Sequence, residues 1–362
     1  MTIRSLLALG LLALASLAQA QNPRVLLDTD RGPMLLELDS TRAPNTVANF
    51  LAYVDNGGYN STLMQRAVRN FVVQGGRFKD TGAEVPQRPA IGSERNNGLS
   101  NTLGTIAMAL SGNPPNVSSA TSDFFINTGN NAAALDPNFT VFGRLVFGFR
   151  ALDALNNNPV FTNSDQPIRI PLLKRAVRVA PGEFPILPVH TATWYDPNNS
   201  GKGFLIEVAH AAGTDANPLL VVSWYDFFEG RQIWMIGIAP FSWGAHQVEV
   251  PMQISTGAQF GPAFNPSQIT SNPNWGRLTV RFTSCDTGSF SYTSIYGNGT
   301  IPVKALTSPT TESCTGGCPR MRAAQAGAAR RLNRLRPSPP APAIPPSSAA
   351  AKPSPWPGAP SP

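Results

Sequence analysis

Residues 59–78, Y-N-S-T-L-M-Q-R-A-V-R-N-F-V-V-Q-G-G-R-F, constrain the fold of this chain more than any other stretch. The apolar pair Val72-Val73 is typical of a short strand, and the glycine pair Gly75-Gly76 closes it. A strand with these neighbours presents three groups that could hold a peptide at one sheet edge: a cation, an aromatic ring and a carboxamide, from Arg66, Phe71 and Gln74.

The order of residues in this stretch resembles the signature of the cyclophilins, the peptidyl-prolyl isomerases. The usual form of that signature is close to F-H-R-x-x-x-x-F-x-x-Q-G-G-x-F. Met64 and Gln65 replace the usual Phe and His. The matching residues are Arg66, Phe71, Gln74, Gly75, Gly76 and Phe78.

Three later blocks follow in the family's order. Residues 104–109 resemble the strand G-x-(I/L)-(S/A)-M-A, and residues 118–127 resemble N-S-(A/G)-x-S-Q-F-F-I. Residues 135–143 resemble L-D-x-x-(H/Y)-x-V-F-G. Four blocks in register identify residues 24–179 as similar to a cyclophilin domain.

The elements expected around these blocks agree with the resemblance. Residues 24–38 predict a hairpin, and Ala43-Pro44-Asn45 opens a helix that Gly57-Gly58 ends. A second helix over 148–155 and a closing strand near 170–179 complete the plan. The fold class expected is mainly β, with a cyclophilin-like closed β-barrel and two helices over residues 21–180.

The resemblance implies a site for rotation about X-Pro peptide bonds, without cofactor or metal. Arg66 would be the catalytic arginine, and Gln74 would orient it or hold a substrate carbonyl. The partners implied are proline-containing polypeptides. The other residues that would bind the substrate, including the pocket for the proline ring, are Phe71, Val72, Ala109, Asp123, Phe125, Leu135 and Phe139.

The chain departs from the family at several of these positions. Asp123 replaces the usual Gln of S-Q-F-F, which places a carboxylate near the cation. If Asp123 pairs with Arg66, it could orient the guanidinium or neutralise its field. Ala134 stands where some members carry a Trp, and Phe139 replaces His or Tyr. Activity is expected, at a reduced level if these changes weaken the site.

The N-terminus predicts export. Arg4 precedes an apolar run over residues 6–17, and Ala18-Gln19-Ala20 follows as a small-residue cleavage site. Residues 1–20 are therefore expected to be a signal peptide, because the apolar run is too short to span a membrane. The expected location is the periplasm, with external release as the alternative.

Charge separates the body of the chain from its tail. The net charge of +7 comes from the tail: after Pro319 there are six arginines and Lys352 but no acid. Between Gln21 and Cys318, 20 basic residues face 21 acidic ones, so nothing suggests a nucleic-acid partner. The basic tail would either make weak contact with an anionic surface or stay solvated and disordered.

Residues 181–189, rich in proline, predict a linker to a second domain over 190–318. Short aromatic and β-branched runs at regular spacing there favour an all-β sandwich or barrel. Phrases such as W-Y-D-P-x-x-S-G-x-G resemble an uncharacterised β-rich domain of exported bacterial proteins. Residues 196–207 nearly fit a calcium loop, but the flanking residues favour strands and a β-turn.

The last part of the chain contains all three cysteines and a tail of unusual amino-acid composition. Export favours a disulfide, and either Cys285–Cys314 or Cys314–Cys318 could form it. Residues 319–362, basic and then rich in Pro, Ala and Ser, predict disorder.

Three functions remain at this point. The first is an exported foldase whose β domain holds or localises clients. The second is a catalytically weak module that binds proline segments, and the third is a surface interaction protein.

Overall fold

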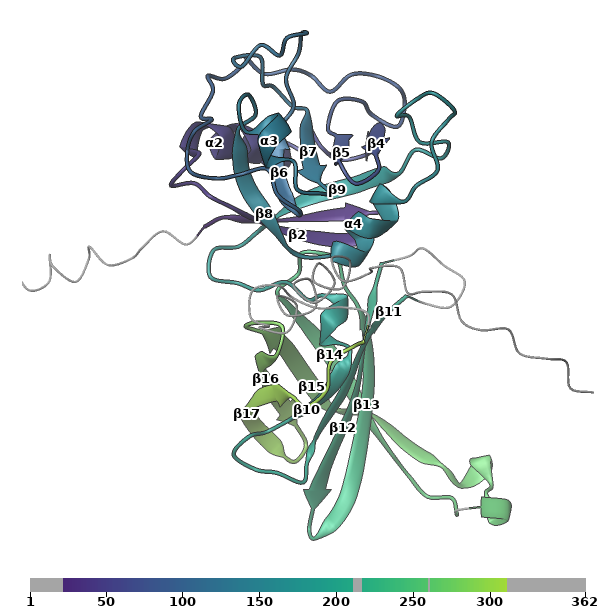
Figure 1. Ribbon diagram of the computed structural model, residues 1–362. Coiled ribbons are helices and arrows are strands. Elements are labelled where there is room, and N and C mark those ends of the chain that lie inside the picture. Colours follow the sequence, from purple (N-terminus) through teal and green to yellow (C-terminus); the bar gives the residue numbers. More distant parts are fainter. Residues whose placement is uncertain (1–21, 211–216, 260, 311–362) are drawn as a thin grey trace, which may run out of the picture. The chain divides into compact units, whose positions relative to one another are not determined.

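The computed structural model describes residues 22–210, 217–259 and 261–310. The expected signal peptide, the expected disordered tail, Cys314 and Cys318 lie outside the described residues. The described chain is mainly β and contains two sheets, a nine-stranded sheet in the first half and a closed barrel in the second (Figure 1).

The first sheet has the strand order β3-β9-β1-β2-β8-β6-β7-β5-β4. The expected N-terminal hairpin is β1 with β2, and the expected closing strand is β9. The bounds are β1 (Arg24–Thr29), β2 (Gly32–Leu38), β3 (Thr62–Leu63), β4 (Arg66–Val68), β5 (Val72–Gly75), β6 (Thr105–Met108), β7 (Phe124–Asn127), β8 (Val141–Phe147) and β9 (Leu172–Val179).

The sheet curls because its two end strands are consecutive in the chain. Strands β3 and β4 lie at opposite ends of the strand order, yet only Met64 and Gln65 separate them. The three peptide units from Leu63 to Arg66 span roughly 11 Å at most, so the ends must come together. The barrel expected from the sequence is thus a curled sheet whose ends are joined through the chain.

Helices accompany this sheet at both expected places. Helix α2 (Pro44–Asp55) begins at its proline, and α4 (Phe149–Asn156) follows β8. A third, one-turn helix, α3 (Ala132–Leu135), was not expected. Phe50 of α2 packs against Tyr59, Phe124 and Phe142, with ring centroids 5.0–5.6 Å apart, and so holds α2 to the core.

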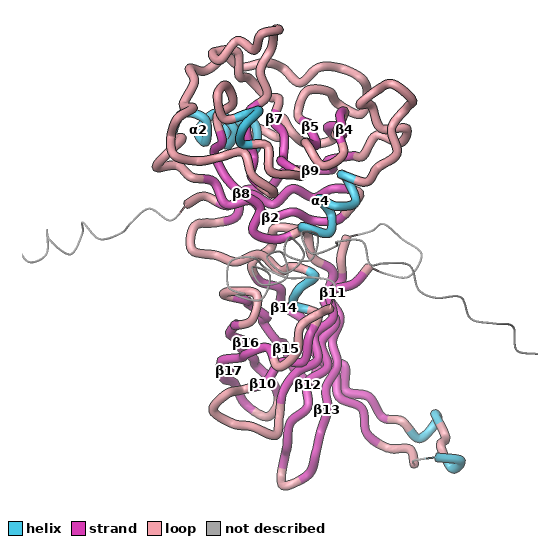
Figure 2. Tube along the Cα trace, in the orientation of Figure 1, coloured by secondary structure: helices cyan, strands magenta, loops and turns pink. Residues whose placement is uncertain are grey.

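The second sheet resolves the choice between sandwich and barrel. Eight antiparallel strands follow one another in chain order, and β10 pairs with β17 to close the barrel (Figure 2). The bounds are β10 (Ala192–Tyr195), β11 (Gly203–Ala209), β12 (Leu219–Phe228), β13 (Arg231–Pro240), β14 (Gln247–Thr256), β15 (Thr270–Phe282), β16 (Thr287–Ser294) and β17 (Gly297–Ala305).

Aromatic side chains fill the barrel. Trp194, Trp224 and Trp275 are all buried, and Trp224 meets Trp275 edge-on with ring centroids 5.5 Å apart. The residues at 196–202 form the turn between β10 and β11, as the strand prediction required. Trp234 differs from the buried tryptophans, because 48% of its surface is exposed.

The segment before the barrel is packed rather than free. Ile186 is buried and donates its N–H to the carbonyl of Ala245 at 2.8 Å. Glu183 accepts hydrogen bonds from Arg281 at 2.7–3.0 Å. Cys285 is disulfide-bonded.

His190 ties this segment to the barrel in one protonation state. Its Nδ1 accepts from the N–H of Leu187 at 3.0 Å, so Nε2 carries the proton and donates to the carbonyl of Ser284 at 3.1 Å. The ring stacks on Phe282 at 3.7 Å. Burial lowers the pKa of His190 from 6.5 to about 3, and the Ser284 hydrogen bond opposes that change only in part.

We therefore predict that the free energy of unfolding of the barrel falls as the pH drops below about 6.5. The unfolded chain then binds a proton that the folded chain excludes, at a cost of about 2 kcal/mol at pH 5. Tryptophan fluorescence during denaturation measures this, since residues 22–189 contain no tryptophan. The variant His190→Gln should be less stable at pH 7 but lose less stability between pH 7 and pH 5; an unchanged slope would contradict the prediction.

Candidate functional site

Four strands bring the predicted polar and aromatic groups into one row. Arg66 on β4 is the cross-strand partner of Gln74 on β5. Gln74 is also the partner of Phe125 on β7, and Phe125 is the partner of Ala107 on β6. Because directly opposed residues share a face of a sheet, all four side chains project from the same face.

A small hydrophobic cluster, separate from the main core, shares Phe125 and Ala107 with this row. The rings of Phe125 and Phe139 meet edge-on with centroids 5.5 Å apart. All six apolar residues that the sequence proposed for substrate binding fall in this cluster. Its buried members are Val72, Ala107, Ala109, Phe125, Leu135 and Val141, and its partly buried members are Phe71, Leu99 and Phe139.

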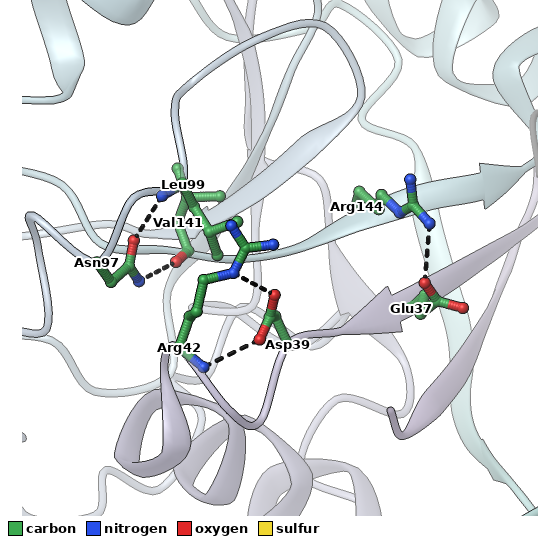
Figure 3. Close-up of polar contacts among 7 residues, drawn as sticks. All are labelled: Glu37, Asp39, Arg42, Asn97, Leu99, Val141 and Arg144. Carbon is green, nitrogen blue, oxygen red and sulfur yellow. Dashed lines mark hydrogen bonds and ion pairs between the residues drawn. The ribbon is translucent and has the colours of Figure 1, made fainter. Parts of the chain in front are cut away.

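Asn97 fixes one side of the cluster (Figure 3). Its Nδ2 donates to the carbonyl of Val141 at 2.9 Å, and its Oδ1 accepts from the N–H of Leu99 at 3.0 Å (Figure 3). The side chain of Asn97 thus links the loop before β6 to strand β8 through hydrogen bonds. Leu99 and Asn97 were not identified from the sequence, because they lie in a polar loop without a motif.

A row of buried amides supports the opposite side. Nδ2 of Asn127 donates to Oδ1 of Asn101 at 3.0 Å, and Nδ2 of Asn131 donates to Oδ1 of Asn127 at 2.7 Å. Nδ2 of Asn131 also donates to the carbonyl of Phe71 at 2.6 Å, and the N–H of Leu135 donates to the carbonyl of Asn131. The amide row therefore positions two of the cluster's side chains.

Asp136 anchors this row to the loop. Its carboxylate accepts from the hydroxyl of Ser100 at 2.6 Å, and from the N–H and side chain of Asn101 at 2.7 and 2.9 Å. Burial acts to raise the pKa of Asp136, but these hydrogen bonds outweigh it and lower the pKa. Asp136 and Asn127 both lie within the family blocks, which was the only signal for them in the sequence.

The pairing of Arg66 with Asp123 that the sequence raised is wrong. Arg66 pairs with Asp165: Nε and Nη2 donate to Oδ2 at 3.0 and 2.9 Å. The N–H of Ala67 also donates to the carbonyl of Asp165 at 2.8 Å, so the loop before β9 is held along β4. Asp165 lies 99 positions after Arg66, outside every block, and so had no sequence signal.

Asp123 instead contacts Gln74. Its carbonyl accepts from the N–H of Ala109 at 2.9 Å, which places it beside the cluster. Burial raises the pKa of the carboxyl to about 6; Arg77 and the hydrogen bond with Gln74 lower it in part, while Glu84 raises it further. Oδ1 is buried and has no hydrogen-bond partner among the described residues.

Gln65, which replaces the family's usual His, also carries buried polar atoms without hydrogen bonds to described residues. Both polar atoms of its side-chain amide are buried, and neither makes a hydrogen bond to a described residue. A buried unpaired amide costs about 1–3 kcal/mol. The residue lies between the two end strands of the sheet, directly before Arg66.

Residues 22–210, 217–259 and 261–310 contain no group of side chains that could form a metal site. No three His, Cys, Asp or Glu residues there are grouped so that they could hold an ion. Over the same residues, no helix has the length and apolar character needed to span a membrane.

Residues 24–176 match the family model described as cyclophilin type peptidyl-prolyl cis-trans isomerase/CLD. A peptidyl-prolyl cis-trans isomerase of Acinetobacter baylyi is 37% identical over 177 residues, which cover 46% of this chain and 92% of that protein. The peptidyl-prolyl cis-trans isomerase cyp18 of Streptomyces antibioticus is 40% identical over 136 residues, which cover 36% of this chain and 80% of that protein.

A solved structure also matches part of the chain. It is the crystal structure of a cyclophilin type peptidyl-prolyl cis-trans isomerase from Cryptosporidium parvum, at 27% identity and a TM-score of 0.38. The match covers 44% of this chain and 98% of that chain.

Because the pKa of Asp123 is raised, we predict that its carboxyl contributes stability at low pH that is lost as the pH rises through about 6. The difference between the folded value and the unfolded value near 3.8 corresponds to a loss of about 3 kcal/mol at most. Amide hydrogen exchange of β7, measured from pH 4 to pH 7, reports the local free energy of opening.

The variant Asp123→Asn is the matched control, since it keeps the shape and cannot ionise. It should gain stability relative to the natural chain as the pH rises from 4 to 7. A constant difference between the two proteins over this range would show that Asp123 titrates at its ordinary pKa.

Proposed function

Since this chain belongs to the cyclophilin-type peptidyl-prolyl cis-trans isomerase family, we propose that its first domain catalyses rotation about peptide bonds that precede proline. The observation that carries the proposal is the row of Arg66, Gln74 and Phe125 beside a small, partly open apolar cluster. A cation and an apolar surface side by side are what a twisting X-Pro bond requires.

The reaction breaks no bond, so the site needs neither nucleophile nor base. Resonance across the C–N bond resists rotation, and the uncatalysed step takes tens to hundreds of seconds. In the twisted state the proline nitrogen becomes pyramidal and regains its lone pair. A fixed donor near that nitrogen stabilises the twisted state more than either planar state, which is the condition for catalysis.

Arg66 is the donor that we assign to this role. Its hydrogen bonds to described residues use Nε and Nη2 and go to one oxygen of Asp165, and in this proposal Nη1 donates to the substrate. The pair is exposed, with 38% and 52% of the two side-chain surfaces accessible, and is worth little in stability. Its contribution is the orientation of a guanidinium that would otherwise sample many rotamers.

The apolar cluster holds the proline ring in this proposal. Phe71, Leu99 and Phe139 are only partly buried, so the cluster has a surface open to a ligand, whereas Phe125 lies at its base with 4% of its surface exposed. Gln74 lies between Arg66 and Phe125 in the row, and in this proposal it holds the substrate backbone.

The clients that we propose are proline-containing segments of exported proteins, and the location is the periplasm. The support is the N-terminal pattern of Arg4, an apolar run and Ala18-Gln19-Ala20. The second candidate is a module that binds proline segments with little turnover. The ion pair of Arg66 with Asp165 favours that candidate, because a neighbouring carboxylate weakens the field of the cation.

We predict that Arg66→Ala lowers kcat/KM for an Ala-Pro peptide by roughly 10²-fold or more, as loss of a transition-state donor does elsewhere. Exchange NMR spectroscopy of cis and trans peptide measures the rate. Arg69→Ala is the matched control, because Arg69 is exposed three residues later and should leave the rate unchanged. Peptide binding without any acceleration by the natural chain would instead establish the binding module.

The pair with Asp165 gives a second prediction. Asp165→Asn removes the charge that orients Arg66, and should lower kcat/KM by about two- to fivefold, the scale of an exposed ion pair. Asp55→Asn breaks a comparably exposed pair with Arg178 and serves as the control. A faster Asp165→Asn enzyme would show that the carboxylate competes with substrate for the guanidinium.

A further inference from the structure

The outer face of the barrel along β12 and β13 is apolar. Outward and inward residues alternate on both strands, so the register defines five outward pairs. Eight of these ten positions are apolar, which is the reverse of the usual polar outer face of an antiparallel sheet. The pairs are Leu219–Pro240, Val221–Ile238, Ser223–Ile236, Tyr225–Trp234 and Phe227–Gln232.

The rest of the barrel wall provides the comparison. On β15 the outward residues are Arg277, Thr279 and Arg281, and on β16 they are the partners of these, Thr293, Ser291 and Ser289. Strand β14 turns Gln247, Glu249, Pro251 and Gln253 outward. The outer side of β14–β16 is therefore mainly polar, in contrast to that of β12 and β13.

We define this surface, with Leu205 of β11 beside it, as the β12–β13 face. Leu205 is the cross-strand partner of Ser223, so it fills the gap in the apolar rows. About half of the surface of each of five side chains is accessible to solvent. They are Leu205 (48%), Tyr225 (50%), Phe227 (52%), Trp234 (48%) and Ile238 (53%).

The area of the β12–β13 face is sufficient for a symmetric interface. Large side chains each bury roughly 150–250 Å² when fully covered, so five half-exposed ones supply roughly 500 Å². Two such faces together reach about 1,000 Å², the lower bound for a specific interface. Partly exposed Val221 and Ile236 add to this area.

We propose that the β12–β13 face is an interface between two copies of this chain. None of the ten outward residues of β12 and β13 is charged, and the exposed Glu207 of β11, opposite Val221, lies at the margin of the face. A two-fold axis makes the contact self-complementary, with Tyr225 of one copy packed near Trp234 of the other. Face-to-face packing of two such ribbons is the ordinary geometry of paired sheets.

The exposed side chains, rather than a strand edge, define the occupant. Strand β12 is paired with β11 and β13 on its two sides, whereas β13 is paired with β14 only at Met235–Gly237. The apolar side chains form a broad face ten residues long. A second copy supplies a face of the same length, width and polarity.

The test is sedimentation equilibrium of the full chain from about 1 to 100 µM, at low and high salt. We expect a monomer–dimer equilibrium that salt does not weaken, because the contact is apolar. Tyr225→Ser and Trp234→Ser should each raise the dimer Kd at least tenfold. Phe264→Ser is the matched control, since Phe264 is 56% exposed but lies outside the β12–β13 face.

Ile238→Gln is the alternative variant if an aromatic substitution impairs folding, which circular dichroism would show. A chain that stays monomeric at every concentration overturns the proposal, as does a dimer that none of these variants weakens. A monomer whose Trp234 fluorescence responds to a proline-rich peptide assigns the face to clients instead. The isomerase rate per chain should be the same in all variants, so this proposal and the proposed activity fail separately.

Discussion

The close approach of backbones at Gly75 and Gly76 is the constraint on which the first domain depends. A Cβ at Gly75 would lie 2.5 Å from Sδ of Met64, in the connection between the two end strands of the sheet. A Cβ at Gly76, where φ is +90°, would lie 2.8 Å from the carbonyl of Ser122. Because Gly75 and Gly76 have no side chains, the end of β5 lies directly against the segments that contain Met64 and Ser122. The next residues in these segments are Gln65 and Asp123. The candidate site is formed where these segments meet.

The polar groups around that meeting point are satisfied to different degrees. Asn127 and Asn131 bond one another and the backbone, and a fully bonded network of this kind is rigid. Asp123 and Gln65 each leave buried polar atoms without a partner among the described residues. The amide row therefore holds its side of the apolar cluster rigidly. Gln65, next to Arg66, and Asp123, which contacts Gln74, instead lower the stability of the folded chain, because their buried polar atoms are unpaired within the described part of the chain. Both costs fall at positions where the sequence departs from the family pattern.

The sequence predicted what local pattern and family blocks encode. The strand at Val72, the helix that opens at Pro44 and the grouping of apolar side chains around Phe125 all follow from residue order within short stretches. Asp165 could not be predicted, because its pairing with Arg66 joins positions 99 apart through a loop without a motif. The exposed position of Trp234 was equally hidden. An aromatic residue in a strand is predicted to be buried, and only the strand register shows which face of the sheet it occupies.

Two apolar surfaces of this chain differ in the geometry that limits what they bind. The cluster around Phe125 is small, has partly buried members at Phe71 and Phe139, and shares its row with Gln74 and Arg66. The β12–β13 face is broad, and the outward residues of its two strands are uncharged. An enzyme that works on unfolded chains would lose them to such a face, because their apolar side chains would bind there without reaching the site. Pairing two copies covers the face and leaves the cluster around Phe125 open to clients.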